Sequence, residues 1–330
     1  MRARTVLVTG GAGYIGSHVC KALAQAGWHP VTYDDLSNGH HWAVQWGPLE
    51  QGDMRDAGRL RAVIAAHRPE AVIHLAGRIE ARESVEAPFA FYDVNVCGTL
   101  VLLRSMAEAG IGALIFSSTA ATYGALQCVP VPESHACVPI SPYGRSKLMA
   151  EQMIADVAVM SGLAWTNLRY FNAAGADPEG QIGEAHRQET HLIPLAIAAA
   201  RGEVETFSVF GRDHPTPDGS CVRDFIHVSD LAEAHVLALT RLLDGEASTT
   251  LNLGTGTGAS VLEVLQCVEE VTGLSVPTRN LDGRAEDLPI LVGDASKAKS
   301  LLSWTPRRSD LASIIADAWA WHSGHSLRRN

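Results

Sequence analysis

Tyr143 stands four residues before Lys147 in the stretch SPYGRSKLMAEQM, which covers residues 141 to 153. On a helix, positions four apart lie on the same face, so both side chains can point into one site. An ammonium group beside a phenol favours the phenolate and lowers its pKa from the usual value of about 10. A tyrosine of this kind can take a proton from a hydroxyl group. The pair predicts acid–base chemistry, although the same spacing also occurs by chance.

A glycine-rich loop near the N-terminus could hold a partner for that chemistry. Gly10, Gly13 and Gly16 stand three residues apart in TGGAGYIGSH, between a strand-like run and a helix-like one. Such glycines permit a tight turn and a close approach of the backbone to a pyrophosphate, which the N-terminus of the next helix attracts. The spacing is GxxGxxG rather than the GxGxxG of classical dehydrogenases. The alternative to a dinucleotide site is a simple turn between the strand and the helix. The loop predicts a dinucleotide site.

Two acidic residues could complete this dinucleotide site. Asp34 ends the second strand-like run, 18 residues after Gly16. A carboxylate at that place accepts hydrogen bonds from the adenosine ribose and repels a ribose 2'-phosphate, so we expect NAD rather than NADP. Asp53, in GDMRD, is placed to meet the adenine edge, and a helix cap is the alternative role. A second glycine-rich stretch, LGTGTGAS at 253–260, is better explained as a turn that leads to Ser260 as a helix N-cap.

Short apolar runs alternate with helix-period segments through residue 170. This rhythm predicts an α/β fold, a Rossmann-type doubly wound parallel sheet, whose ligands bind at the carboxyl ends of the strands. After Asn172 the chain becomes rich in Gly, Pro and Asp, which predicts a smaller α/β C-terminal substrate lobe. We expect a dinucleotide-binding domain over 1–171 and a substrate lobe over 172–330. We expect parts of 225–260, among them TLNLG at 250–254, and the C-terminal helix to join the first domain. The predicted strands are 5–9, 30–34, 71–75, 113–118 and 165–170, and the predicted helices start at Tyr14 and after Asp56 and cover 89–109, 143–160 and 260–272.

Composition narrows the possible partners. The chain has 330 residues and a formal net charge of -10, and its basic residues form no run of five, which argues against nucleic acid as a partner. The longest apolar stretch, IPLAIAAA at 193–200, is far short of the roughly 20 residues of a membrane span. The six Cys have no CxxC spacing, and the N-terminal apolar run is too short for a signal peptide, so we expect a cytoplasmic protein with free thiols. No HExxH motif or carboxylate cluster suggests a metal.

Longer motifs carry a resemblance that runs nearly from end to end. They are VTGGAGYIGSH, GDMRD, VIHLAG, FYDVNVCGT, SSTAATYG, SPYGRSK, LRYFNAAGADPEG, VFGRD, TPDGSCVRDFIHVSDLAEAH, LNLGTGTG and DLPILVGDASKA. In this order the chain resembles the extended branch of the short-chain dehydrogenase/reductase superfamily, and within it the nucleotide-sugar 4-epimerases. The resemblance implies interconversion of UDP-galactose and UDP-glucose. Hydride would pass from sugar C4 to a tightly bound NAD and return to the other face of a 4-keto intermediate.

The resemblance also implies roles for individual residues. Tyr143 is the implied acid–base group, Thr119 bonds the reacting hydroxyl, Lys147 also binds the nicotinamide ribose, and Asn95 supports this group. The implied cofactor contacts are Gly10, Gly13, Tyr14, Ile15, Gly16, Asp34, Asn38, Asp53, Met54, Leu75, Ala76, Gly77, Asn95, Ser117, Tyr143, Lys147 and Tyr170. The implied substrate contacts are Thr119, Tyr143, Asn172, His191, Leu192, Phe210, Arg223, Arg284 and Asp287, with the two arginines as diphosphate clamps. A homodimer through the helices at 89–109 and 143–160 is implied as well.

Several alternatives stay open at this point. Sugar-nucleotide dehydratases of the superfamily need an Asp-Glu pair just after the Thr, but here Ala120 and Ala121 stand there and cannot transfer a proton. Epimerases of UDP-N-acetylhexosamines, hexuronates or pentoses keep the same three catalytic residues. Leu291, where the family has an aromatic for plain hexoses or a smaller residue for N-acetylated ones, does not decide between them. The loop at 74–84, with Arg78 and Glu80, also departs from the family. A non-catalytic NAD sensor is the last alternative.

Overall fold

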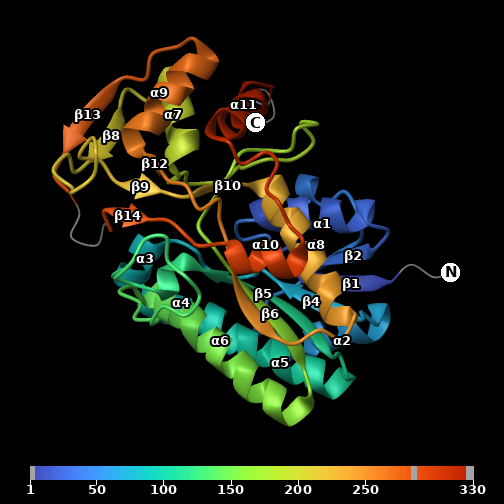
Figure 1. Ribbon diagram of the computed structural model, residues 1–330. Coiled ribbons are helices and arrows are strands. Elements are labelled where there is room, and N and C mark those ends of the chain that lie inside the picture. The colour runs from blue at the N-terminus through green and yellow to red at the C-terminus, as the bar shows by residue number, and fades with distance from the viewer. Residues whose placement is uncertain (1–3, 284–287, 325–330) are drawn as a thin grey trace.

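A seven-stranded parallel sheet forms the centre of the computed structural model, which describes residues 4–283 and 288–324 (Figure 1). The strand order is β11-β6-β5-β4-β1-β2-β3, and every neighbouring pair is parallel. The strands are β1 (Thr5–Thr9), β2 (His29–Asp34), β3 (Leu49–Gln51), β4 (Ala71–His74), β5 (Ala113–Thr119), β6 (Ala164–Tyr170) and β11 (Thr249–Leu253). The predicted Rossmann-type sheet is confirmed, as is the return of the TLNLG segment to it as β11.

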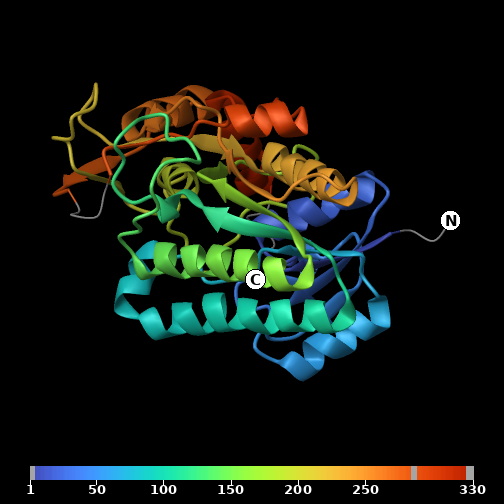
Figure 2. The ribbon, with the colours of Figure 1, turned by 60° about the horizontal axis from the view of Figure 1, so that its bottom comes forward.

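Helices cover both faces of this sheet, which is why its central strands β1, β4 and β5 are buried along nearly their whole length. In β1, Val6 and Val8 belong to the core under α1 and α8, whereas Leu7 between them belongs to the core under α2, α5 and α6. Figure 2 shows α5 and α6 side by side below the sheet. The first face carries α1 (Tyr14–Gln25), α8 (Val228–Leu243) and α10 (Ser296–Leu302), and the second carries α2 (Ala57–His67), α5 (Gly98–Ala109) and α6 (Pro142–Ser161).

The helix predicted over 89–109 has an irregular middle. It follows α3 (Ala81–Glu86) and consists of α4 (Pro88–Phe91), a wider π turn η2 (Tyr92–Cys97) and α5, and it ends at Gly110 in the left-handed conformation. Single π turns inside helices often occur at functional sites, because the extra residue redirects a side chain. Here the π turn carries Asn95, one of the residues that the sequence places in the site.

A smaller lobe is built from the second half of the chain. Its core lies between α7 (Leu192–Ala200), α9 (Val261–Thr272) and α11 (Leu311–Gly324). Three short sheets complete it: β8 (Phe207–Phe210) with β13 (Thr278–Leu281), β9 (Val222–Arg223) with β12 (Ala259–Ser260) and β14 (Ile290–Leu291), and β7 (Asn172–Ala174) with β10 (Phe225–His227). Two short 3-10 turns, η1 (His41–Ala43) and η3 (Ala120–Thr122), lie in the first lobe.

The C-terminal helix does not join the first lobe as expected. α11 packs on α9 and α7, because Ile314, Ile315 and Ala318 face the apolar side of α9. The helix that returns to the sheet is instead α10, through Ala298 and Leu302. The predicted division of the chain at residue 171 stays a prediction, since α8, β11 and α10 all return across it.

The second glycine-rich stretch has the structural role that the sequence indicated. Ser260 caps α9 in a reciprocal capping box with Glu263. The loop before it is held by the buried carboxylate of Asp224, which accepts hydrogen bonds from the backbone N–H groups of Thr255 and Gly256. In residues 4–283 and 288–324, none of the helices has the length and apolar character needed to cross a bilayer.

Candidate active site

The residues singled out from the sequence meet where β1, β4, β5 and β6 end. In a doubly wound sheet, this carboxyl edge is where ligands bind. The backbone of Gly10, after β1, approaches Ala76, after β4, so closely that a Cβ on Gly10 would lie 2.6 Å from the Ala76 nitrogen. Thr119, at the end of β5, is in register with Tyr170 at the end of β6. The edge therefore joins the predicted cofactor loop to the predicted acid–base group.

The glycine-rich loop has the geometry that a pyrophosphate needs. Gly10 has a φ of +73°, and a Cβ on Gly16 would lie 2.0 Å from the Gly10 carbonyl oxygen, so both positions require glycine. Within the described ranges, no side chain caps α1 at Gly13, and its first turn carries no acidic residue. Free N–H groups and the helix dipole at this end attract a negative group. Tyr14 and Ile15, also predicted contacts, begin this helix.

Asp34 is fixed beside the loop at the end of β2. Its carboxylate is 8% exposed and accepts hydrogen bonds from the backbone N–H groups of Leu36 at 2.9 Å and Ala12 at 3.0 Å. Burial raises the pKa of this carboxyl group, and the two N–H groups oppose that rise. A buried acceptor at this strand end fits the ribose of NAD and disfavours a ribose phosphate.

The other predicted adenosine contacts are Asn38, Asp53 and Met54. Asn38 lines a pocket together with Gly13 and Tyr14, and Met54 is buried. The Asp53 carboxylate is paired with Arg55, which lowers the pKa of Asp53, and it does not cap a helix, because Asp56 caps α2 instead. The alternative role for Asp53 is therefore excluded, and its contact with adenine stays a prediction.

Tyr143 and Lys147 enter the site from the first turns of α6. Ser141 caps this helix by accepting the Gly144 N–H, and Pro142 follows at its first position. The Lys147 ammonium donates to the Ser117 carbonyl at 3.0 Å and lies near Gly77. Tyr143 shares a hydrogen bond with Thr119, which opposes the effect of burial on the Tyr143 pKa. The Ser117 hydroxyl forms a hydrogen bond with the Tyr170 hydroxyl. The three predicted catalytic residues thus form one connected group.

The protonation of this group differs from the expectation. Burial raises the pKa of Tyr143 to about 12, the charge of Glu80 adds to the rise, and Lys147 is not among the causes that lower it. Burial also lowers the pKa of Lys147 to about 8, against the effect of Glu151. The prediction that Lys147 lowers the pKa of Tyr143 is wrong for this state of the protein, because burial dominates the Tyr143 pKa and the hydrogen bond with Thr119, not Lys147, opposes it.

Asn95 holds the walls of the site together from the π turn. It is buried, its Oδ1 accepts the Arg78 N–H at 2.8 Å, and its Nδ2 donates to the Arg78 carbonyl at 3.0 Å and to the Ser146 hydroxyl at 2.9 Å. A Cβ on Gly77 would lie 2.9 Å from the Asn95 Oδ1. The loop after Leu75 and Ala76 is therefore tied to α6 at the level of Lys147.

A buried ion pair behind the site was not found from the sequence. Glu151, one turn beyond Lys147, accepts hydrogen bonds from Arg169 Nε at 2.9 Å and from Nη2 at 2.5 Å, and also from the Ser118 hydroxyl. Both side chains of the pair are 7% exposed. The sequence did indicate that Lys147 and Glu151 lie on one helix face. It did not indicate that Arg169, 18 residues after Glu151, would pair with it.

The predicted substrate contacts come from the smaller lobe. Asn172 follows Tyr170 closely and donates from Nδ2 to the Asp224 carbonyl at 3.1 Å, which places it beside Arg223. Arg223 donates from Nη1 to the Leu288 carbonyl at 2.7 Å. Phe210 ends β8. Arg284 and Asp287 lie outside the described residues, so the predicted second clamp is not placed.

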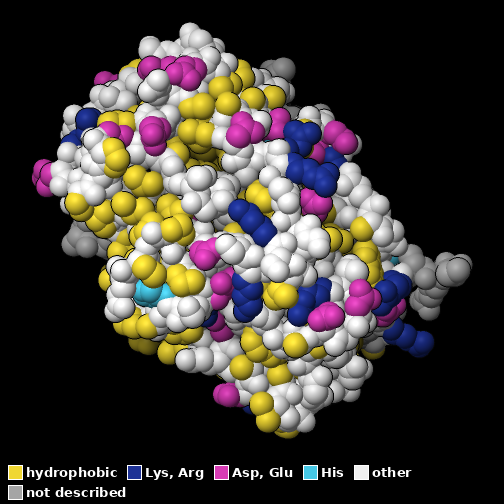
Figure 3. Space-filling view, in the orientation of Figure 1, with side chains coloured by type: hydrophobic (Ala, Val, Ile, Leu, Met, Phe, Trp, Pro, Cys, Tyr) yellow, Lys and Arg dark blue, Asp and Glu magenta, His cyan; other side chains and the backbone are white. Residues whose placement is uncertain are grey.

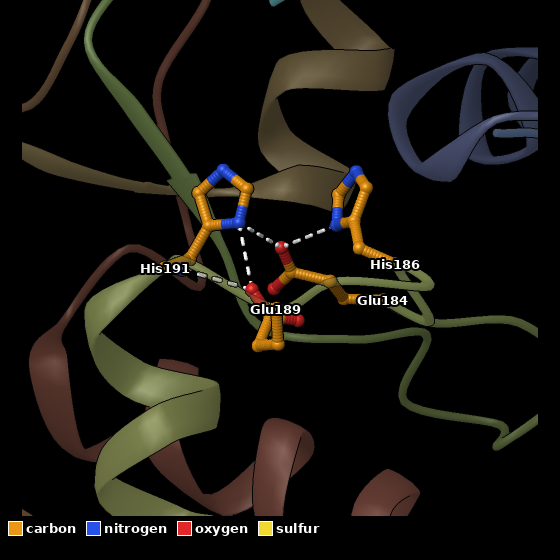
Figure 4. Close-up of side chains that lie close together, drawn as sticks. All are labelled: Glu184, His186, Glu189 and His191. Atoms are coloured by element: carbon orange, nitrogen blue, oxygen red, sulfur yellow. Dashed lines mark hydrogen bonds and ion pairs between the residues drawn. The ribbon is translucent and has the colours of Figure 1, made fainter. Parts of the chain in front are cut away.

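His191, the N-cap of α7, belongs to a cluster that the sequence analysis missed (Figure 4). The buried Glu184 carboxylate lies 3.1 Å from His186 Nδ1 and 2.9 Å from His191 Nδ1, and Glu189 lies 2.8 Å from His191 Nδ1. The ligand atoms of all four side chains lie within 4.8 Å of one another. The signal was the local pattern Glu-x-His-x-x-Glu-x-His at 184–191. The predicted lack of a metal stays a prediction.

Comparison with known proteins agrees with this geometry. The model of the NAD dependent epimerase/dehydratase family matches residues 6–254. A UDP-glucose 4-epimerase from Rhizobium leguminosarum bv. trifolii is 54% identical over 323 residues, which is 98% of each chain. The structure of UDP-glucose 4-epimerase from Brucella ovis in complex with NAD has a TM-score of 0.95 at 48% identity and covers 96% of this chain and 98% of its own. The Bifidobacterium longum enzyme, in complex with NAD+ and UDP, has a TM-score of 0.91 at 36% identity and covers 97% and 98%. This chain therefore belongs to the NAD dependent epimerase/dehydratase family.

Proposed function

We propose that the protein is an isomerase that interconverts UDP-galactose and UDP-glucose with bound NAD. The observation that carries the proposal is the connected group of Thr119, Tyr143 and Lys147 beside the glycine-rich loop. Ala120 and Ala121 follow Thr119 in η3 and offer no second proton-transfer group for elimination. The relatives solved with NAD and UDP support both ligands.

The roles of the three catalytic residues follow from their contacts. When bound, NAD accepts a hydride from the sugar C4 and returns it. The Tyr143 oxygen takes the C4 hydroxyl proton and later gives it back, and Thr119 bonds the same hydroxyl. Burial holds Tyr143 protonated in the structure, so a positive charge beside it is needed for the phenolate to form. Lys147 does not lower the Tyr143 pKa in this structure, so we assign it to the nicotinamide ribose, and the positive nicotinamide ring of bound NAD would supply the charge. Asn95 fixes the wall against which Lys147 lies.

The nucleotide part of the substrate is assigned to the smaller lobe. Arg223 supplies a guanidinium for the diphosphate, and His191 and the first backbone N–H groups of α7 at Leu192 face the same anion. Asn172 and Phe210 line this side. Arg284 and Asp287 remain proposed contacts on the same side.

A substrate panel tests this assignment. Purified protein given UDP-galactose without added NAD is expected to form UDP-glucose until the two reach equilibrium, because the cofactor stays bound. UDP-N-acetylhexosamine, UDP-hexuronate and UDP-pentose serve as the competing substrates, and chromatography of the products measures each. Turnover of UDP-glucuronate with no reaction of UDP-galactose would replace the proposed substrate. Leu291, in β14, packs against the cluster that contains Ala120 beside Thr119, and it is the first position to vary if N-acetylated sugars react as well.

We propose that two copies of the chain pair through the helices at 89–109 and 143–160. Met149 and Met160 are 42% and 77% exposed, and with the partly buried Met153 they form one stripe on α6. Phe89 is 89% exposed on α4. Figure 3 shows apolar side chains, interrupted by polar ones, at the lower left, in front of the place that α3 and α4 occupy in Figure 1. Exposed apolar side chains in one stripe favour a partner.

Light scattering checks the dimer. The wild type is expected at about twice the chain mass of 35.2 kDa. The double variant Met149→Glu with Met160→Glu is expected at one chain mass, because it places two charges in the apolar contact. Leu274→Glu, on the smaller lobe and 40% exposed, is the control that should stay dimeric. A monomeric wild type refutes this part of the proposal.

The cellular setting is proposed on two grounds. None of the six cysteines forms a disulfide, as expected in a reducing cytoplasm, and the proposed reaction would serve galactose metabolism. Cell fractionation with an antibody to the protein checks the location.

A further inference from the structure

Glu184 is a buried carboxylate that is paired with two imidazole rings. It is 3% exposed, and its ion pairs within the described residues are with His186 and His191. Its backbone carbonyl is fixed separately by the indole N–H of Trp321 at 2.9 Å. A buried carboxylate is stable only when it is paired and hydrogen-bonded, so the loop before α7 is organised around this charge.

The cluster lies between the two predicted ligand sites. The His186 ring meets Tyr14 of the glycine-rich loop at a centroid distance of 6.5 Å. On the other side, the Thr190 hydroxyl donates to Glu80 at 3.0 Å, and Glu80 acts electrostatically on Tyr143. The loop that carries His191 is therefore tied, through Thr190 and Glu80, to the side of the site that holds Tyr143.

We propose that Glu184, together with Glu189, is a positioning residue that keeps His191 as an imidazolium turned toward the diphosphate of the substrate. The inference rests on the proposed function, because it assigns the diphosphate of a nucleotide sugar to this side of the site. The inference adds the His191 imidazolium to the arginine proposed for the diphosphate, and it gives the two glutamates a role in substrate affinity.

The orientation of the ring supports this role. Both carboxylates meet His191 at Nδ1, so this nitrogen donates to them and carries the proton. Figure 4 shows the other ring nitrogen on the side away from both carboxylates, where it can donate to a ligand. Two carboxylates this close repel each other, and a proton on His191 Nδ1 between them relieves that repulsion.

The electrostatics agree with the geometry. Burial lowers the pKa of His191, but the hydrogen bonds and charges of Glu184 and Glu189 outweigh it and raise the pKa to about 11. Burial raises the pKa of Glu184, but His186 and His191 outweigh it and lower the pKa to about 2. The titratable groups next to the cluster include Tyr14 from α1, Glu80 from the loop before α3 and His40, which lines a pocket with His186. Arg187, in the same loop, donates to the Leu36 carbonyl.

A divalent metal is the competing occupant of the same four side chains. Each imidazole Nδ1 already lies at hydrogen-bond distance from a carboxylate oxygen, so a proton between them satisfies both. A metal would have to displace both protons. The geometry therefore favours the ion pairs over a metal, and the response of the KM to EDTA and Zn²⁺ distinguishes them.

The test is the pH dependence of the KM for UDP-galactose, measured on the NAD-loaded protein. UDP-galactose suits this purpose because its diphosphate does not titrate near neutrality. For the wild type, we expect a KM that changes little between about pH 6 and 9, since His191 stays charged. For Glu184→Gln, we expect the KM to rise about 10-fold over that range with kcat nearly unchanged, because the His191 pKa falls toward its ordinary value. Glu108→Gln, an exposed glutamate at the end of α5, is the matched control.

A double-mutant cycle shows whether Glu184 acts through His191. His191→Gln should raise the KM at every pH, and adding Glu184→Gln to it should change nothing further. Because Glu184 is buried, melting curves accompany each variant, and the more exposed Glu189→Gln carries the same expected shift if Glu184→Gln does not fold. NMR of the wild-type ring nitrogens, assigned with His191→Gln, should show His191 protonated throughout the range.

The outcomes separate the two proposals. Glu184→Gln with the flat KM profile of the wild type overturns the role of Glu184 and leaves the proposed function intact. No reaction of the wild type with UDP-galactose overturns the proposed function itself. A wild-type KM that EDTA raises and Zn²⁺ restores would assign the cluster to a metal and also overturn the inference.

Discussion

Tyr143→Phe is expected to lose most of the epimerase activity, with kcat lower by about 10²- to 10⁴-fold, the usual contribution of a general acid–base group. The phenol oxygen of Tyr143 is the proposed proton-transfer atom, and it shares a hydrogen bond with Thr119. The ring remains and can keep its edge contact with Phe91, so the fold should not change. Initial rates of UDP-glucose formation measure the effect, and the absorbance of purified protein measures the retained NAD.

Tyr123→Phe is the matched control for this variant. Tyr123 is also buried, but its hydroxyl donates to Asn252 at 2.7 Å, outside the catalytic group. Losing that bond should lower the free energy of unfolding by about 1 kcal/mol and leave kcat nearly unchanged. Nearly full activity of Tyr143→Phe would refute the acid–base assignment, and equal losses in both variants would point to a structural cause.

Breaking the buried ion pair behind the site is expected to have the largest effect on stability. Glu151→Leu leaves the Arg169 guanidinium uncompensated where both side chains are 7% exposed. The loss of a partner from a buried pair typically lowers the free energy of unfolding by about 3–5 kcal/mol. Denaturant unfolding at a fixed NAD concentration measures it, since a bound ligand adds to stability.

Two further variants give this prediction its control. Glu151→Leu combined with Arg169→Met should recover much of the loss, because no buried charge remains unpaired. Glu70→Leu removes the exposed partner of Arg4 and should change the free energy of unfolding by less than about 1 kcal/mol. If Glu151→Leu is as mild as Glu70→Leu, the ion pair does not stabilise the fold.

Local patterns in the sequence predicted the sheet and the cofactor loop well. The apolar runs that became β1, β4, β5 and β6 are fully or mostly buried, and burial on both faces leaves such a run few alternatives. Gly16 was recognisable because its close neighbour Gly10 is near in the sequence, and Gly10 because it takes a positive φ in a tight turn. The start of α6, with Ser141 and Pro142, was predictable for the same reason.

Features that depend on tertiary packing were not predictable. The placement of α11 on α9 rather than on the sheet depends on which apolar face meets which, and both helices are amphipathic in the sequence. The pKa of Tyr143 depends on how completely the fold excludes water from it. Arg169 gives no sign in the sequence that it will pair with Glu151. Glu184 lies in a loop without periodicity, so its burial appears only in the fold.

The path of the chain between the lobes limits how the molecule can move. The chain leaves the sheet after β6, returns as α8 and β11, leaves again before α9, returns as α10 and leaves for α11. Opening one lobe from the other like a hinge would bend all of these crossings at once, whereas hinge motion is favoured when few segments absorb the change. Access to the carboxyl edge of the sheet therefore depends on local loop excursions, and a dinucleotide bound there would escape slowly, so its retention becomes a matter of kinetics as well as affinity.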